Sequence, residues 1–137
     1  MYVIDASIFA SVIVKDEFYD KAREIIKEHR KNGLITVDII YVEVANVLWK
    51  HVFAFKRIPV ETFSKLKEII LPLIQNTVSK VYDSKDLIIR ALDNAVKYGI
   101  TVYDSLYVTL ALETNSKLLT FDEELKKKLA RLEPNIL

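Results

Sequence analysis

Four short apolar runs rich in β-branched residues recur along the chain, and helical spacing follows each of them. The runs are YVI at 2–4, LITV at 34–37, TVSKVYD at 77–83 and KLLTF at 117–121. Parallel strands need long crossover connections, which helices supply. The alternation therefore predicts an α/β fold with a mainly parallel central sheet. The run NIL at 135–137 is a candidate for a further short strand.

The intervening segments show helical periodicity and recognisable ends. Pro59 stands where a helix can begin, Ser84 is a candidate N-cap, and Gly33 and Gly99 stand where left-handed caps close helices. The expected helices cover residues 7–14, 17–33, 38–55, 59–74, 84–99, 103–115 and 122–132.

Length and composition narrow the class of protein. At 137 residues the chain is expected to form one domain, residues 1–137, with a core that needs no disulfides. No cysteine is present, which excludes Cys-based metal sites and nucleophiles and is compatible with a reducing compartment. The opening MYVIDASIFASVIV lacks a basic leader and is too short to span a bilayer, so we expect a cytoplasmic protein without a membrane partner. The net charge of +1 means that any nucleic acid must be held by a local basic patch.

Two aspartates follow predicted strands. Asp5 ends the run YVI, and Asp122 follows the run KLLTF. Ligands of open α/β sheets bind at the carboxyl ends of the strands, so both carboxylates are candidates for a functional site. Each also has a structural alternative, because Asp5 stands at a helix start and Asp122 can cap the helix after it. Thr120 with Glu123 offers a second capping pattern there.

Two further acids lie on predicted helices. Glu43 shares a face with Ile40, Val44 and Val47, where a carboxylate must find donors, a cation or a proton, and Asn46 lies beside it. The alternative is a Glu that reaches water at the edge of this face. Asp104 stands near the start of its helix. It fits a capping box with Thr101, so a cap and a functional carboxylate are both open.

The α/β prediction places these four carboxylates in one cleft, where they would repel one another unless a cation binds. Oxygen ligands suit Mg²⁺ or Mn²⁺ better than Zn²⁺. The only glycines are Gly33 and Gly99, so there is no glycine-rich phosphate loop. We interpret His29 and His51 as solvent-facing. With no cysteine and no phosphate loop, chemistry based on carboxylates and a metal ion is what remains.

Four sequence blocks carry a resemblance to a known family. The blocks VIDASIFA, YVEVANVL, VYDSLYVTLA and LLTFDEEL, in this order, resemble PIN-domain proteins, particularly the VapC-type toxins of toxin–antitoxin pairs. The resemblance runs along the whole chain. It implies a three-layer α/β/α sandwich with four to five strands. It also implies a Mg²⁺- or Mn²⁺-dependent endoribonuclease, usually a homodimer, that a cognate antitoxin protein silences.

The resemblance extends to single residues. Asp5, Glu43, Asp104 and Asp122 match the acidic quartet of the family, and Ser7 and Thr120 match hydroxyl positions close to it. Glu43 with Asn46 matches a Glu-x-x-Asn pair. Ser7 replaces a frequent Thr, and Phe121 stands where small residues are common.

Phosphodiester hydrolysis needs a nucleophilic water and stabilisation of phosphoryl charge, and metal ions supply both. We expect Asp5 and Asp104 to be the principal metal ligands. Glu43 would hold the metal or orient its water, and Asp122 would help to bind a second ion or a water.

A basic and aromatic stretch, WKHVFAFKR at 49–57, is the best candidate for RNA binding. Aromatic side chains stack on bases and basic groups neutralise phosphates. Its aromatic residues can instead serve packing, dimerisation or docking of the antitoxin. The expected RNA contacts are Lys50, His51, Lys56, Arg57 and Arg90, with Lys97 as a further candidate.

Two other functions remain open at this point. One is a PIN-like module that binds RNA or a protein without cleavage. The other is a PIN nuclease in RNA processing or DNA cleavage. The complete acidic quartet argues against the first.

Overall fold

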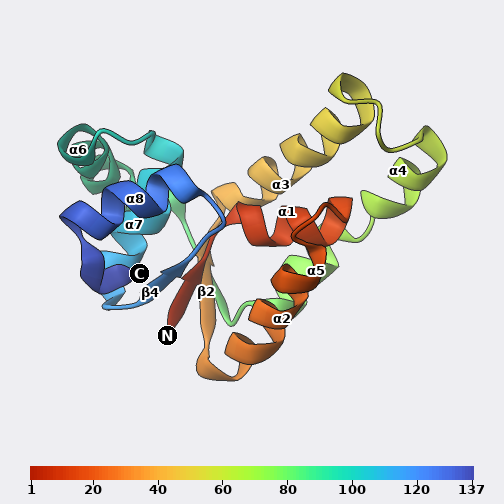
Figure 1. Ribbon diagram of the computed structural model, residues 1–137. Coiled ribbons are helices and arrows are strands. Elements are labelled where there is room, and N and C mark those ends of the chain that lie inside the picture. Colours follow the sequence, from red (N-terminus) through yellow and green to blue (C-terminus); the bar gives the residue numbers. More distant parts are fainter.

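The computed structural model describes residues 1–137, and its centre is a sheet of four parallel strands (Figure 1). The order across the sheet is β3-β2-β1-β4, so the N-terminal strand lies between the second strand and the last. Tyr2 of β1 pairs with Leu34 on one side and with Lys117 on the other. The strands are β1 (Tyr2–Ile4), β2 (Leu34–Val37), β3 (Lys80–Tyr82) and β4 (Lys117–Leu119).

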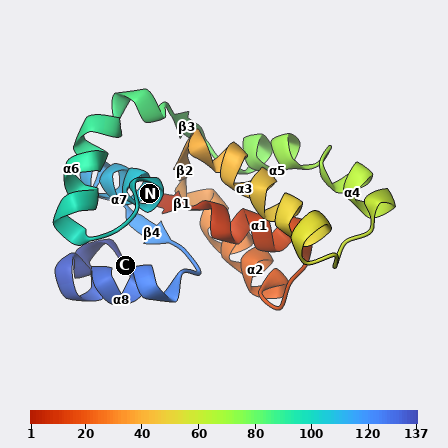
Figure 2. The ribbon, with the colours of Figure 1, turned by 90° about the horizontal axis from the view of Figure 1, so that it is seen from above.

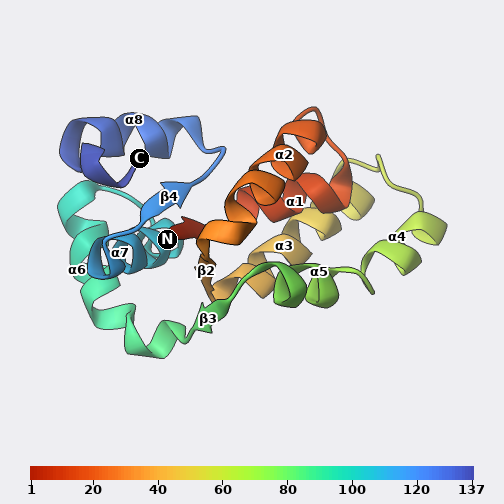
Figure 3. The same ribbon diagram turned by 90° about the horizontal axis from the view of Figure 1, so that it is seen from below.

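Helices cover both faces of the sheet, which confirms the expected three layers. Figures 1 and 3 show α6, α7 and α8 on one face and α1, α2, α3 and α5 on the other. None of the helices has the length and apolar character needed to cross a membrane. The helices are α1 (Ala6–Val14), α2 (Tyr19–His29), α3 (Ile39–Trp49), α4 (Val60–Leu66), α5 (Ile70–Thr77), α6 (Ile88–Tyr98), α7 (Val102–Thr114) and α8 (Glu123–Leu132).

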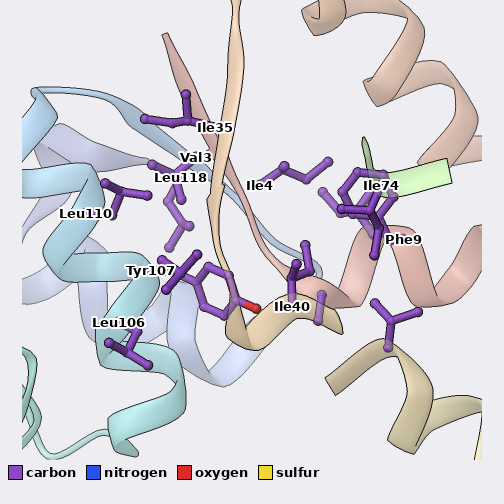
Figure 4. Close-up of a cluster of buried hydrophobic side chains, with 14 of the residues drawn as sticks. Val3, Ile4, Phe9, Ile35, Ile40, Ile74, Leu106, Tyr107, Leu110 and Leu118 are labelled. Carbon is purple, nitrogen blue, oxygen red and sulfur yellow. The ribbon is translucent and has the colours of Figure 1, made fainter. Parts of the chain in front are cut away.

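The core lies on both sides of β1 and β2. All four residues of β2 are buried, as expected for a strand covered by helices on both faces. Figure 4 shows Tyr107 and Leu110 of α7 beside Val3 on one side, and Phe9 with Ile74 on the other. Residues 105–111 of α7 are all buried, so α7 is the central helix of its layer.

An arm extends from this core. The chain continues from α3 into a π-helical turn at Lys50–Ala54, and Lys56 then adopts a left-handed conformation with φ 51° before α4 (Figure 2). We define the arm patch as Trp49, Phe53 and Phe55, whose side chains are exposed. Trp49 stacks on Phe53 with ring centroids 5.4 Å apart.

The prediction of a single helix over residues 59–74 is wrong. Two helices form instead, α4 and α5, and the N–H of Ile69 donates to the carbonyl of Leu66 in the turn between them. Pro72 explains the break, because proline lacks an N–H and clashes with the carbonyl four residues earlier. In the observed structure Pro72 lies in the first turn of α5, where proline is tolerated.

Two smaller expectations are also wrong. Ser84 does not cap α6, which begins at Ile88, because residues 84–86 form a separate 3-10 turn and Leu87 stands at the N-cap position. The N–H of Ser84 donates to Oδ1 of Asp38 (3.1 Å). The run NIL is not a strand. Residues 134–136 form another 3-10 turn that begins at Pro134, whose nitrogen has no hydrogen for a strand ladder.

Candidate active site

A pocket of about 250 Å³ opens at the carboxyl ends of β1 and β4 and is bounded by α1, α3 and α7. Four separate segments bring the predicted carboxylates Asp5, Glu43, Asp104 and Asp122 into its wall. A larger hollow of about 720 Å³ lies along α2, but its lining combines basic, acidic and apolar side chains, and basic residues outnumber acidic ones. The lining of the smaller pocket, called the acidic pocket below, is Asp5, Ala6, Ser7, Glu43, Asn46, Val47, Lys50, Asp104, Tyr107 and Asp122.

Asp5 is both the N-cap of α1 and the most buried of the four carboxylates. Its Oδ1 accepts the backbone N–H of Ser7 at 3.0 Å and the hydroxyl of Ser7 at 2.5 Å. Burial raises the pKa of Asp5 to about 6, and hydrogen bonds from Ser7 and Thr120 oppose this rise. The structural and functional interpretations of Asp5 are therefore compatible, since both bonds from Ser7 fall on Oδ1.

Glu43 faces the pocket from α3 and is half-buried. The hydroxyl of Tyr107 donates to its Oε1 at 2.6 Å. Burial raises the pKa of Glu43, the bond from Tyr107 opposes the rise, and the nearby charge of Asp104 adds to it. The side chain is thus held by a partner on another helix rather than reaching freely into water.

Asp104 and Asp122 both lie at helix starts. Thr101 caps α7 by accepting the N–H of Asp104 at 3.2 Å, and Asp122 caps α8 by accepting the N–H of Leu125 at 3.0 Å. Thr120 is not the cap of α8, because its hydroxyl accepts the N–H of Asp122 instead. Burial raises the pKa of the Asp104 carboxyl, and the charge of Asp122 raises it further.

Ser7 connects two parts of the pocket. Besides its bond to Asp5, its hydroxyl oxygen accepts the backbone N–H of Phe121 at 2.9 Å. The start of α1 and the connection from β4 to α8 are thereby tied together. Asn46, one turn after Glu43, also lines the pocket.

Lys50 is the only basic residue in the lining. It lies two turns after Glu43 on the same side of the helix, is exposed, and has no ion pair within 4.0 Å. Its ammonium group is therefore free to meet an anion at the mouth of the pocket.

The other expected RNA contacts lie outside the acidic pocket. Arg57 donates to Nδ1 of His51 (2.9 Å) and to the carbonyl of Val14, so it ties the arm to α1. Lys56 is exposed at the turn of the arm. Arg90, on α6, forms a two-point ion pair with Glu113 at 2.6 and 2.9 Å.

The prediction that both histidines face solvent is wrong. His29 is half-buried against Tyr2, with ring centroids 4.2 Å apart, because the end of α2 packs beside the start of β1. His51 is half-buried as well, between the edge of the Phe55 ring and the guanidinium of Arg57. Burial is the main cause that lowers the pKa of His51, and the charge of Arg57 lowers it further.

Tyr107 is the residue of the pocket that the sequence interpretation missed. Its ring belongs to the core, and only its hydroxyl reaches the carboxylates (Figure 4). The spacing held a signal, since Tyr107 is three residues after Asp104 and so lies on the same helix face.

The donor set of the acidic pocket consists of carboxylate, hydroxyl and amide groups, which are the ligands that hard divalent cations prefer. Burial is the main cause that raises the pKa values of Asp5, Glu43 and Asp104. None of these three carboxylates forms an ion pair within 4.0 Å. In their present positions no three acidic or histidine side chains are close enough to hold one ion together. The donor chemistry of the pocket nevertheless fits a divalent cation.

Fold and pocket together define the class of protein. The family model of the PIN domain matches residues 2–129, and the chain belongs to this family. Over 130 residues it is 34% identical to Ribonuclease VapC3 of Pyrobaculum aerophilum, with 95% of both chains covered. Its structure is similar to the crystal structure of PAE2754 from Pyrobaculum aerophilum. The TM-score is 0.67 at 28% identity, and 93% of this chain and 84% of that chain are covered.

Proposed function

We propose that this protein is a metal-dependent endoribonuclease, the toxin of a VapBC-type pair, that cleaves RNA phosphodiester bonds in the acidic pocket. One observation carries the proposal. Four carboxylates from separate segments converge on one pocket, in a PIN-domain chain that is 34% identical to a protein named as a ribonuclease.

Asp5 and Asp104 are the principal ligands in this proposal, with Glu43 and Asp122 completing the set around Mg²⁺ or Mn²⁺. When bound, such an ion lowers the pKa of a water and offsets the charge on the phosphoryl oxygens. The protein's own groups hold the carboxylate ligands in place. Ser7 holds Asp5, and the N–H of Leu125 holds Asp122, each leaving one carboxylate oxygen unoccupied by these bonds.

Lys50 is the residue that we assign to the RNA phosphates. It lines a pocket whose other charged groups are all acidic, so it provides the only positive charge that the lining offers a phosphate. The exposed arm patch flanks Lys50 in sequence and offers aromatic faces. A cognate antitoxin protein would cover apolar surface of this kind.

The test is cleavage of a panel of single-stranded and structured RNAs with Mn²⁺, with EDTA, and by the variant Asp104→Asn. We expect cutting that needs Mn²⁺ and falls at least about 100-fold in Asp104→Asn, because a ligand of the ion is lost. Asp93→Asn is the matched control, since Asp93 is an exposed acid on α6, and it is expected to cut normally.

Absence of both cutting and stabilisation by Mn²⁺ would overturn the proposal in favour of a module that binds without cleavage. Cleavage that persists in EDTA would contradict the proposed metal dependence. Asp104 would in that case serve only the start of α7.

A further inference from the structure

We infer that Tyr107 is a positioning residue of the acidic pocket, which fixes the carboxylate of Glu43 for the bound cation. The inference rests on the proposed function and adds to it a residue without a carboxylate. Its basis is the contact between the Tyr107 hydroxyl and Oε1 of Glu43, 2.6 Å long, which joins α7 to α3.

The ring of Tyr107 is immobilised by the core. The residue is only 2% exposed, and in Figure 4 its ring lies near Leu106 and Leu110 of its own helix and near Val3 and Leu118 of the sheet. Because the ring is fixed, the position of its hydroxyl is fixed as well. That position depends on how α7 packs against β1, β2 and β4, and not on the surrounding solvent.

The side chain of Glu43, unlike the ring of Tyr107, is not immobilised by the core. It is a long, half-buried side chain on α3, the helix that continues into the exposed arm. Left alone, such a side chain samples several rotamers, and binding a cation would require it to lose that freedom. The bond from Tyr107 to Oε1 restricts Glu43 before any cation binds and leaves Oε2 without this bond.

The position of Tyr107 in α7 makes the contact specific to the site. Asp104 is one turn earlier on the same helix, and both residues line the pocket. One rigid helix therefore places its own carboxylate directly and places the carboxylate of Glu43 through a hydroxyl. The spacing between two ligands on different helices is thus set by α7.

A merely structural role predicts something different, and the chain supplies the comparison. Tyr98 is a second buried tyrosine whose hydroxyl donates to a glutamate, Glu133, also at 2.6 Å, but it does not line the acidic pocket. If Tyr107 serves only the core, then Tyr107→Phe and Tyr98→Phe will both lower stability and neither will change cation binding.

The experiment measures Mn²⁺ binding by calorimetry and the Mn²⁺-dependent rise in Tm for the natural chain, Tyr107→Phe and Tyr98→Phe. We expect Tyr107→Phe to weaken Mn²⁺ binding about tenfold, as is typical for loss of a partner that orients a ligand. Tyr98→Phe is expected to bind Mn²⁺ as the natural chain does. In the Glu43→Ala background, Tyr107→Phe is expected to cause no further loss, because its effect passes through Glu43.

Steady-state cleavage adds a second readout, in which we expect a lower kcat at fixed Mn²⁺ with little change in KM and recovery at high Mn²⁺. Tyr107→Met, which fills the space of the ring without a hydroxyl, replaces Tyr107→Phe if that variant does not fold. Normal Mn²⁺ binding by a folded variant would overturn the inference and leave the proposed function intact. Absence of Mn²⁺ binding by the natural chain would overturn both.

Discussion

Ser7 donates its hydroxyl to Oδ1 of Asp5 and accepts the backbone N–H of Phe121 with the same oxygen. A single side chain therefore joins the end of β1 to the segment that follows β4. These two segments carry Asp5 and Asp122, so the bridge ties together the backbone that bears the two carboxylates. A threonine would keep this hydroxyl and add a methyl group.

Ser7→Ala removes the bridge. We expect the free energy of unfolding to fall by about 1–3 kcal/mol, because Asp5 loses a donor and the Phe121 N–H loses its acceptor. Urea unfolding measures the change. Ser64→Ala is the control, since Ser64 is exposed and bonds only within α4, and it is expected to cost under about 0.5 kcal/mol. Equal losses in the two variants would contradict the prediction.

The buried carboxyl of Asp5 makes stability depend on pH. Burial raises its pKa from 3.8 to about 6, so the native state holds the proton more tightly than the unfolded chain does. Without a divalent cation, stability from this group is full below about pH 4. It is lost as pH rises to about 6 and above, on the order of 3 kcal/mol.

Asp5→Asn is the variant that isolates this effect, because Asn does not titrate. Urea unfolding in EDTA is measured from pH 4 to pH 8. We expect the free energy of unfolding of the variant to rise relative to that of the natural chain across this pH range. The variant is also expected to have a higher Tm at neutral pH and no stabilisation by Mn²⁺. Parallel pH profiles would contradict the raised pKa of Asp5. An unchanged response to Mn²⁺ would contradict the assignment of Asp5 as a ligand.

Lys50→Ala tests the RNA contact. We expect kcat/KM to fall about tenfold at low salt and its salt dependence to become shallower, because one phosphate contact is lost. Binding of Mn²⁺ is expected to be unchanged. Lys65→Ala on the exposed side of α4 and Arg90→Ala are the controls; Arg90 is already paired with Glu113, so we expect little effect of its loss on cleavage.

The antitoxin is expected to bind to the arm patch. We expect backbone amides of residues 49–55 to exchange more slowly with solvent when the cognate antitoxin is added, because exposed apolar surface becomes covered. Phe53 is the most exposed member at 68%, so Phe53→Ser is expected to weaken the complex. Unchanged exchange in this stretch would place the antitoxin elsewhere.

The sequence pattern predicted the parallel sheet and the meeting of the four carboxylates, because these depend on local periodicity and on where strands end and helices begin. The three layers were predicted from the resemblance to PIN-domain proteins. The sequence did not predict contacts that depend on tertiary packing. Asp38 takes the N–H of Ser84 from another part of the chain, and no local pattern signals that. Tyr107 was missed for the same reason, since an aromatic residue within an apolar helix is typical of a core.

The pairing of β4 with β1 has a consequence for synthesis. β1 is made first, but its neighbour on this side is the last strand of the sheet, and Asp122 follows that strand. A chain still attached to the ribosome and shorter than 122 residues can form early helices, yet it lacks one wall of the acidic pocket. On the proposed function, a nascent copy of this length lacks the complete set of carboxylates for cleavage.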